Sequence, residues 1–160
     1  MEILLNKEPV KRVEKIITEF DSNIKIIVLK ETARTAKNAA FSLKCKVGAI
    51  IKSLLFRVEE SFLLCLVPGD KKCSLNKLKF FLNKKDICMA TADEVKKYTG
   101  FSIGGVSPVG HNRKLDILID KSFDRYENLF AAAGHPNCVF KINPEKLIQI
   151  TNGSVKDISK

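Results

Sequence analysis

The chain has 160 residues, of which 45% are hydrophobic and 29% are charged. This length and composition predict one globular domain over 1–160 and exclude a largely disordered chain. The apolar runs are too short to cross a bilayer, and the charged segment 1–8 does not resemble a signal peptide, so we expect no membrane partner. Five cysteines with no C-x-x-C pair favour a reducing, cytoplasmic setting and do not indicate a metal site.

The formal net charge is +10, and many of the lysines fall in the middle third of the chain. A basic surface raises the local concentration of polyanions, and nucleic acid is the most common of these. A source organism with lysine-rich proteins explains the same charge equally well. The charge alone therefore leaves both interpretations open.

Apolar periodicity and capping residues predict the elements of the N-terminal half. Apolar residues from Val10 to Phe20 recur at helical spacing after Pro9, which suits a first helical turn. Thr35 is placed to cap a second helix, and apolar runs on either side of 59–61 predict a hairpin. The expected helices cover 9–20 and 36–43, and the expected strands cover 24–29, 49–58 and 62–67.

The C-terminal half alternates short helices and strands. Ser74 can cap one helix, and the sequence from Thr91 to Glu94 is a capping box for another. Within the domain, residues 1–20 are assigned to the N-terminal helix, and residues 154–160 are expected to form a flexible tail. The expected helices cover 74–82, 91–100 and 144–148, and the expected strands cover 87–90, 115–119 and 138–142. Without regular βαβ spacing, this order predicts an α+β domain with a curved mixed sheet flanked by helices.

A glycine-rich loop from Gly104 to His111 also contains Ser107 and Pro108. Glycine permits positive φ and close approach to the backbone, whereas proline fixes φ. Such a loop can present bare N–H groups to an oxyanion or a phosphate. It can equally be a plain turn between two elements.

A lysine interrupts the apolar strand expected over 49–58. Strand alternation places Lys52 on the same face as Ile50, Leu54 and Phe56. A buried ammonium needs a carboxylate, water or an anion, so Lys52 is predicted to line a pocket that receives an anion. The alternative is a lysine that extends along apolar surface to reach solvent.

A second glycine turn is expected over 131–137, where three alanines precede Gly134, His135 and Pro136. The small residues leave space, and the proline biases His135 away from helical backbone. Histidine at this position can hold a substrate amine, a carbonyl or a water. It can also merely satisfy the hydrogen bonds of the turn.

Taken in order, four segments resemble the YbaK/prolyl-tRNA synthetase-associated domain family, the trans-editing aminoacyl-tRNA deacylases. The resemblance covers residues 20–152. The matching segments are Thr32-Ala33-Arg34-Thr35-Ala36, Val47 to Phe56, Thr99 to His111, and Ala133-Gly134-His135-Pro136.

The resemblance implies a domain that hydrolyses the ester of a mischarged tRNA without a metal or organic cofactor. Lys52 matches the strand lysine that engages the 3′-terminal adenosine, and Gly104 to Pro108 matches the G-x-x-x-P loop beside the ester. Gly134-His135-Pro136 resembles the histidine turn of the prolyl-synthetase editing domain. The implied catalytic residues are Lys52, Gly104, Gly105, Ser107 and His135. The implied substrate-binding residues are Arg34, Thr35, Phe56, Pro108, Gly110, His111, Gly134 and Pro136.

The expected partners are aminoacyl-tRNA and a cognate synthetase. The pattern at Gly134-His135-Pro136 departs from the cysteinyl-tRNA(Pro) deacylase branch, which favours a small amino acid such as alanine. Serine, threonine and 2-aminobutyrate stay open. An aminoacyl ester is labile, so water can attack it when backbone donors stabilise the oxyanion, and the tRNA 2′-hydroxyl can assist. The alternative function is a non-catalytic RNA-binding or synthetase-associated module of the same fold.

Overall fold

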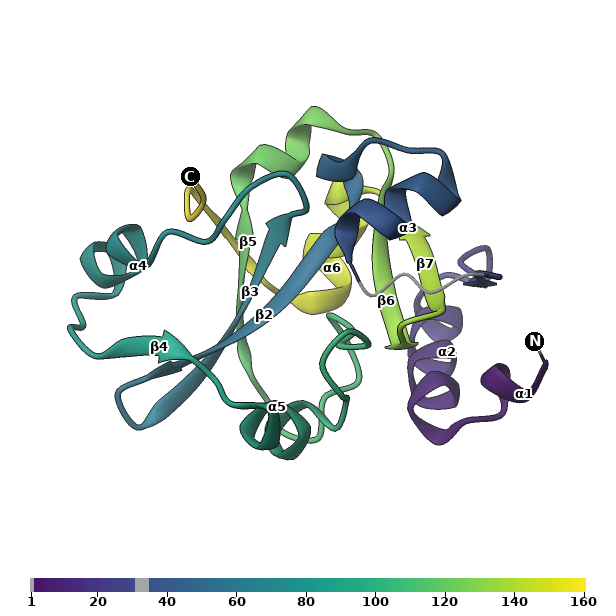
Figure 1. Cartoon of the computed structure of the whole chain (residues 1–160), viewed down its shortest axis with the longest axis horizontal. Coiled ribbons are helices and arrows are strands. Elements are labelled where there is room, and N and C mark those ends of the chain that lie inside the picture. The colour runs from purple at the N-terminus through teal and green to yellow at the C-terminus, as the bar shows by residue number, and fades with distance from the viewer. Residues whose placement is uncertain (1, 31–34) are drawn as a thin grey trace.

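The computed structural model describes residues 2–30 and 35–160. Helices and strands alternate along the chain, with two 3₁₀ turns at Val47–Ala49 and Lys121–Arg125 (Figure 1). The helices are α1 (Glu2–Leu5), α2 (Glu8–Phe20), α3 (Ala36–Leu43), α4 (Leu75–Leu82), α5 (Ala92–Thr99) and α6 (Pro144–Thr151). The strands are β1 (Ile26–Val28), β2 (Ile51–Val58), β3 (Ser61–Pro68), β4 (Ile87–Met89), β5 (Asp116–Asp120), β6 (Leu129–His135), β7 (Cys138–Ile142) and β8 (Ser154–Lys156).

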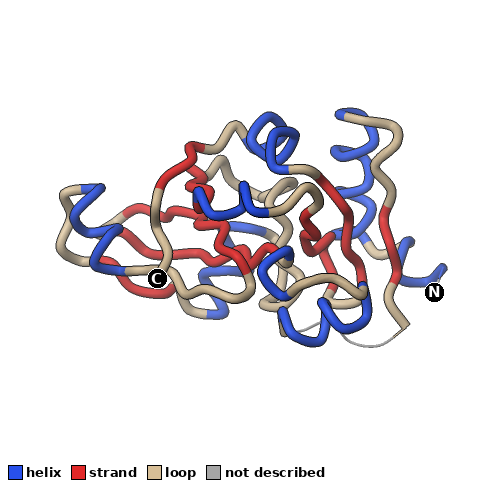
Figure 2. The backbone as a smooth tube through the Cα atoms, turned by 90° about the horizontal axis from the view of Figure 1, so that it is seen from above, coloured by secondary structure: helices blue, strands red, loops and turns tan. Residues whose placement is uncertain are grey.

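The strands form two sheets, seen as two groups in Figure 2. The smaller sheet has the order β1-β7-β6 and is antiparallel. The larger sheet has the order β4-β2-β3-β5-β8 and is mixed, because β5 pairs in parallel with both β3 and β8. A bridge between Ile50 and Phe130 connects the two sheets. The predicted α+β class with mixed pairing is confirmed, although the strands divide between two sheets.

The predicted helices and strands are present, with ends that differ by a few residues. Thr35 caps α3 by accepting the Asn38 N–H at 3.1 Å. The capping box at Thr91 and Glu94 starts α5 as expected. Capping residues and apolar periodicity are therefore enough to predict these elements, without knowledge of their tertiary contacts.

The tight turn predicted within 131–137 is present but short. Residues 131–135 belong to β6, and the turn consists of Pro136 and Asn137. Alanine has a low strand propensity, but pairing with β7 and packing against α2 decide the conformation here. Gly134 has a φ of +92°, and a Cβ on it would lie 2.8 Å from the carbonyl carbon of Pro9. Glycine at this position therefore lets β6 contact the start of α2.

The main core lies between α2 and the faces of both sheets. Val10, Val13 and Ile17 project from α2 and have no exposed surface. Cys65 and Cys138 are also fully buried, as their apolar surroundings in the sequence indicated. Over the described ranges, no helix is long and apolar enough to cross a membrane.

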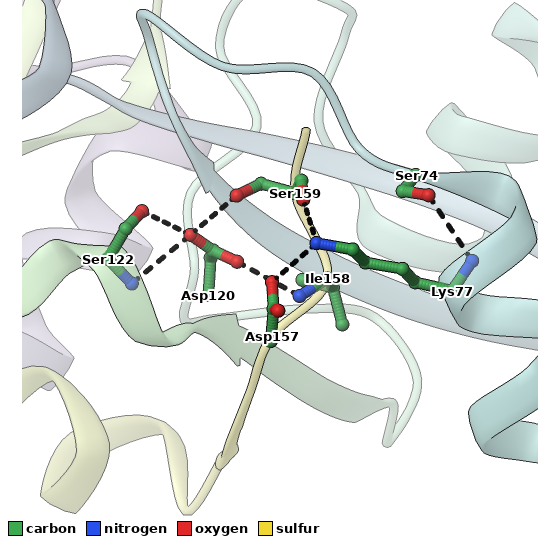
Figure 3. A network of polar contacts seen from close by, with 7 residues as sticks. All are labelled: Ser74, Lys77, Asp120, Ser122, Asp157, Ile158 and Ser159. Atoms are coloured by element: carbon green, nitrogen blue, oxygen red, sulfur yellow. Dashed lines mark hydrogen bonds and ion pairs between the residues drawn. The ribbon is translucent and has the colours of Figure 1, made fainter.

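The C-terminal segment is held in place, so the predicted flexible tail over 154–160 is wrong. β8 pairs with β5, and Ile158 is fully buried. Figure 3 shows Asp120 as the acceptor that holds this segment. Its carboxylate, which is 1% exposed, accepts the Ile158 N–H at 3.0 Å and the Ser159 hydroxyl at 2.9 Å, and also the Ser122 hydroxyl. This contact could not be predicted from the sequence, because the tail carries few apolar residues and Asp120 lies 38 residues before Ile158.

We expect Asp120→Ala to lower the free energy of unfolding by about 3 kcal/mol, since hydrogen bonds to a charged group contribute about 1.5–3 kcal/mol each. The Ile158 N–H would lose its partner in a buried position. Urea unfolding measures this change. Asp157→Ala is the control, because Asp157 forms an exposed ion pair with Lys77. Its loss should change stability by less than about 1 kcal/mol. Equal stability losses in the two variants would contradict the role given to Asp120.

Candidate functional site

A pocket of about 640 Å³ lies where β2, α3, β6 and the loop after α5 meet. β2 and the residue before it contribute Ile50 to Leu55, and α3 contributes its first turn. Ile103, Gly104 and Val106 line it from the loop, and Pro136 lines it from the turn after β6. Most of the lining is apolar, so the few polar groups that reach the pocket can orient a ligand.

Lys52 lines the pocket, as predicted from its place in the strand. The side chain is half-buried, and its Nζ donates a hydrogen bond to the carbonyl of Lys71. Burial lowers the pKa of Lys52, while the negative charge of Asp70 opposes this shift. Asp70 itself is held by Arg125 through two hydrogen bonds of 2.9 and 3.0 Å. Lys52 is therefore placed by a main-chain acceptor and has no direct carboxylate partner among the described residues.

The glycine loop and the turn after β6 are in direct contact beside the pocket. The Gly134 N–H donates to the Gly105 carbonyl at 3.1 Å. A Cβ on Gly105 would lie 2.9 Å from the His135 nitrogen, closer than real Cβ atoms approach. Gly104 has a φ of +94° and lies next to Pro136. Two segments that are 30 residues apart in the sequence thus form one continuous wall.

The second half of the loop lies behind this wall. Ser107 is fully buried, and its hydroxyl accepts the Val109 N–H at 3.1 Å. His111 donates from Nε2 to the Ser107 carbonyl at 2.7 Å, and burial lowers the pKa of its ring. Pro108 is buried, and the Gly110 carbonyl accepts a hydrogen bond from Arg12 at 2.7 Å. These predicted residues shape the loop and do not line the pocket.

The remaining predicted residues occupy different places. Thr35 lines the pocket while it caps α3. His135 is half-buried next to Pro136, and its Nδ1 accepts the Asn137 N–H at 3.0 Å. Phe56 is 2% exposed and belongs to the apolar cluster under α4, outside the pocket lining. Arg34 lies outside the described residues.

One expectation about the loop needs correction. The Gly105 N–H donates to the Ser102 carbonyl at 3.0 Å, so it is already used inside the loop. It is therefore not a donor that points at a ligand. The loop reaches the pocket through Ile103, Gly104 and Val106.

Ser53 is a pocket residue that the sequence reasoning missed. Its Oγ is buried and is the one side-chain polar atom of this kind without a hydrogen-bond partner in the described part of the chain. Buried hydroxyls are normally paired, so this hydroxyl in the pocket is available to a polar ligand or to a water molecule. The available signal was a single hydroxyl between Ile51 and Leu55 on one face of an apolar strand.

No group of three or more His, Cys, Asp and Glu side chains within 2–30 and 35–160 is arranged to hold a metal ion. The polar side chains that line the pocket are the ammonium groups of Lys37 and Lys52 and the hydroxyls of Thr35 and Ser53. These groups can bind the polar parts of an ester and stabilise negative charge on its carbonyl oxygen.

The chain is similar to proteins of known family and structure. A family model described as the aminoacyl-tRNA editing domain matches residues 30–150. A solved structure described as a candidate trans-editing enzyme for prolyl-tRNA synthetase aligns with a TM-score of 0.90 and 34% identity, over 96% of this chain and 98% of that one.

This chain covers very different shares of two proteins that are similar to it in sequence. The proline–tRNA ligase of Kosmotoga olearia is 40% identical over 98 residues, which are 60% of this chain and 17% of the ligase. The chain thus spans less than a fifth of the proline–tRNA ligases that it matches first. EbsC of Enterococcus faecalis, named as a candidate Cys-tRNA(Pro)/Cys-tRNA(Cys) deacylase, is 25% identical over 78% of this chain and 77% of its own length.

Proposed function

Because this chain belongs to the aminoacyl-tRNA editing domain family, we propose that it is a trans-editing deacylase of mischarged tRNA. Water adds to the ester carbonyl, and the bond between the acyl carbon and the ribose oxygen breaks. The products are the free amino acid and a tRNA with an intact 3′ end. The similarity of this chain to a part of the proline–tRNA ligases supports tRNA(Pro) as the tRNA and its synthetase as a partner.

The observation that carries this proposal is the convergence of three distant segments on one pocket. Lys52 from β2, Gly104 from the loop after α5 and Pro136 from the turn after β6 line the same space. An ammonium group on one wall suits the polar 3′-terminal ribose, and apolar walls suit a small side chain. No Ser-His-Asp triad is required, since an aminoacyl ester is reactive once it is held in place.

We assign Lys52 to the adenosine end of the substrate and the wall of Gly104 and Gly105 to the ester. His135 would support the amino-acid pocket through the turn that carries Pro136. Its Nδ1 accepts the Asn137 N–H, which fixes the ring within this turn. Ser107 and His111 would act indirectly, by fixing the shape of the loop.

Alanine is the amino acid that we propose, on the basis of Gly134-His135-Pro136. The name of EbsC instead favours cysteine. A hydrophobic pocket separates side chains that differ by one methylene by only about 1–3 kcal/mol, so the two candidates must be compared directly.

The test is a panel of tRNA(Pro) charged with alanine, serine, threonine, cysteine or proline, and ester loss is followed with and without the protein. Faster hydrolysis of the alanyl ester than of the prolyl ester is the expected result. Preference for the cysteinyl ester would correct the substrate and keep the reaction. Binding of the tRNAs with no hydrolysis of any ester would favour the alternative, a non-catalytic RNA-binding module.

A further inference from the structure

The main chain at Ser53 lies on an edge of β2 that no strand of the described residues covers. β3 pairs with β2 along its whole length, whereas β4 pairs with it only over 56–58. At the other end, a single bridge joins Ile50 to Phe130. The stretch around Ser53 lies between these contacts, and it lines the pocket.

Hydrogen-bond alternation determines where the Ser53 main chain points. Gly69 donates its N–H to the Ile50 carbonyl at 2.8 Å, so Ile50 and every second residue after it face β3. Ile51 and Ser53 therefore face away from β3. Pro68 confirms this pattern, because it has no N–H and lies opposite Ile51. Both the N–H and the C=O of Ser53 point to the open edge.

The register of β4 explains why this edge is open. Ala90 donates its N–H to the Leu55 carbonyl at 3.0 Å. Two residues further, the same antiparallel register would place Ala92 opposite Ser53. Ala92 is instead the first residue of α5, whose capping box begins at Thr91. The chain turns into a helix just where a strand partner for Ser53 would lie.

We propose that the aminoacyl group of the substrate pairs with Ser53 at the open edge of β2, as one residue of a neighbouring strand would. Its α-ammonium would donate to the Ser53 carbonyl, and its ester carbonyl would accept the Ser53 N–H. An α-amino ester carries this donor and this acceptor with the spacing of a peptide residue, which a phosphate or a nucleobase lacks. The unpaired Ser53 hydroxyl supplies one more polar group at the same place. This inference rests on the proposed deacylase function and names the residue that recognises its substrate.

The pairing also supplies a donor that the glycine loop lacks. The Gly105 N–H is used by Ser102, whereas the Ser53 N–H faces the pocket edge. When water adds to the ester, the carbonyl oxygen gains negative charge, and the Ser53 N–H is in position to stabilise it. Ser53 would thus contact the reacting group directly through its main chain.

Amide NMR of the ¹⁵N-labelled protein tests the contact. The probe is 3′-alanylamino-3′-deoxyadenosine, in which an amide replaces the labile ester, and the control is 3′-amino-3′-deoxyadenosine. We expect the probe alone to move the Ser53 amide resonance downfield and to slow its hydrogen exchange. An unchanged Ser53 resonance overturns the inference. If the wild-type protein still deacylates the tRNA panel, the proposed function stands without this contact.

Two substitutions test the same contact by activity. Ser53→Pro removes the N–H that faces the pocket and breaks no bond to β3, since Ser53 faces away from that strand. We expect kcat to fall by about 100-fold or more, as when an oxyanion donor is lost. Ser53→Ala keeps the main chain and should lose about tenfold or less. Equal losses in two folded variants would assign the effect to the hydroxyl; if Ser53→Pro does not fold, the NMR titration decides.

Discussion

Lys52→Ala is expected to lower kcat/KM for deacylation by about 100-fold or more while the chain stays folded. Lys52, the second residue of β2, is the lysine that this strand contributes to the pocket lining. Hydrogen bonds from a charged group contribute about 1.5–3 kcal/mol each. The free energy of unfolding should change by only about 1 kcal/mol. The variant loses the bond to the Lys71 carbonyl but also the cost of burying an ammonium.

Two further variants make this result specific. Lys52→Met keeps most of the side-chain volume and removes the charge, so it should be as inactive as the alanine variant. Lys72→Ala removes the same unit of charge from an exposed neighbour outside the pocket lining, and it should keep most of the activity. Steady-state kinetics on alanyl-tRNA(Pro) and urea unfolding provide the two readouts. A wild-type rate in Lys52→Met would show that deacylation does not need the ammonium of Lys52.

Local signals in the sequence predicted most of the fold. The periodicity of α2 and the capping residues Thr35 and Thr91 act within one or two turns, so they are visible without a structure. β6 and β8 are different, because their residues have weak strand preference and depend on partners far along the chain. The division into two sheets also follows from long-range pairing, which no local pattern encodes.

The sequence predicts which segments form the candidate site, but not which of their residues line the pocket. Lys52 and Gly104 stand out as a charge in an apolar strand and as a glycine in a shaped loop, and both line the pocket. Ser107 and His111 belong to the same conspicuous loop but turn toward the protein interior. Ser53 went unnoticed because its importance depends on where β4 stops pairing, which is a property of the sheet.

Gly105→Ala should separate the glycine loop from the turn that carries His135. The new Cβ would lie 2.9 Å from the His135 nitrogen and 3.0 Å from the Gly134 carbonyl carbon, and both are backbone atoms that cannot rotate away. The bond from the Gly134 N–H to the Gly105 carbonyl would lengthen as the loop retreats. Crowding of this kind costs about 1–3 kcal/mol of stability.

The effect on activity should be larger than the effect on folding, because a displacement of about 1 Å in a catalytic wall can cost about 100-fold in rate. Gly153→Ala is the matched control. Its Cβ would lie 2.8 Å from a side-chain atom of Ile119, which can move aside. Neither Gly153 nor Ile119 lines the pocket. Comparing kcat/KM with urea unfolding for both variants separates the two effects. If Gly105→Ala were as active as Gly153→Ala, close contact between the loop and the turn would not be needed to hold the ester, and the site would depend on β2 alone.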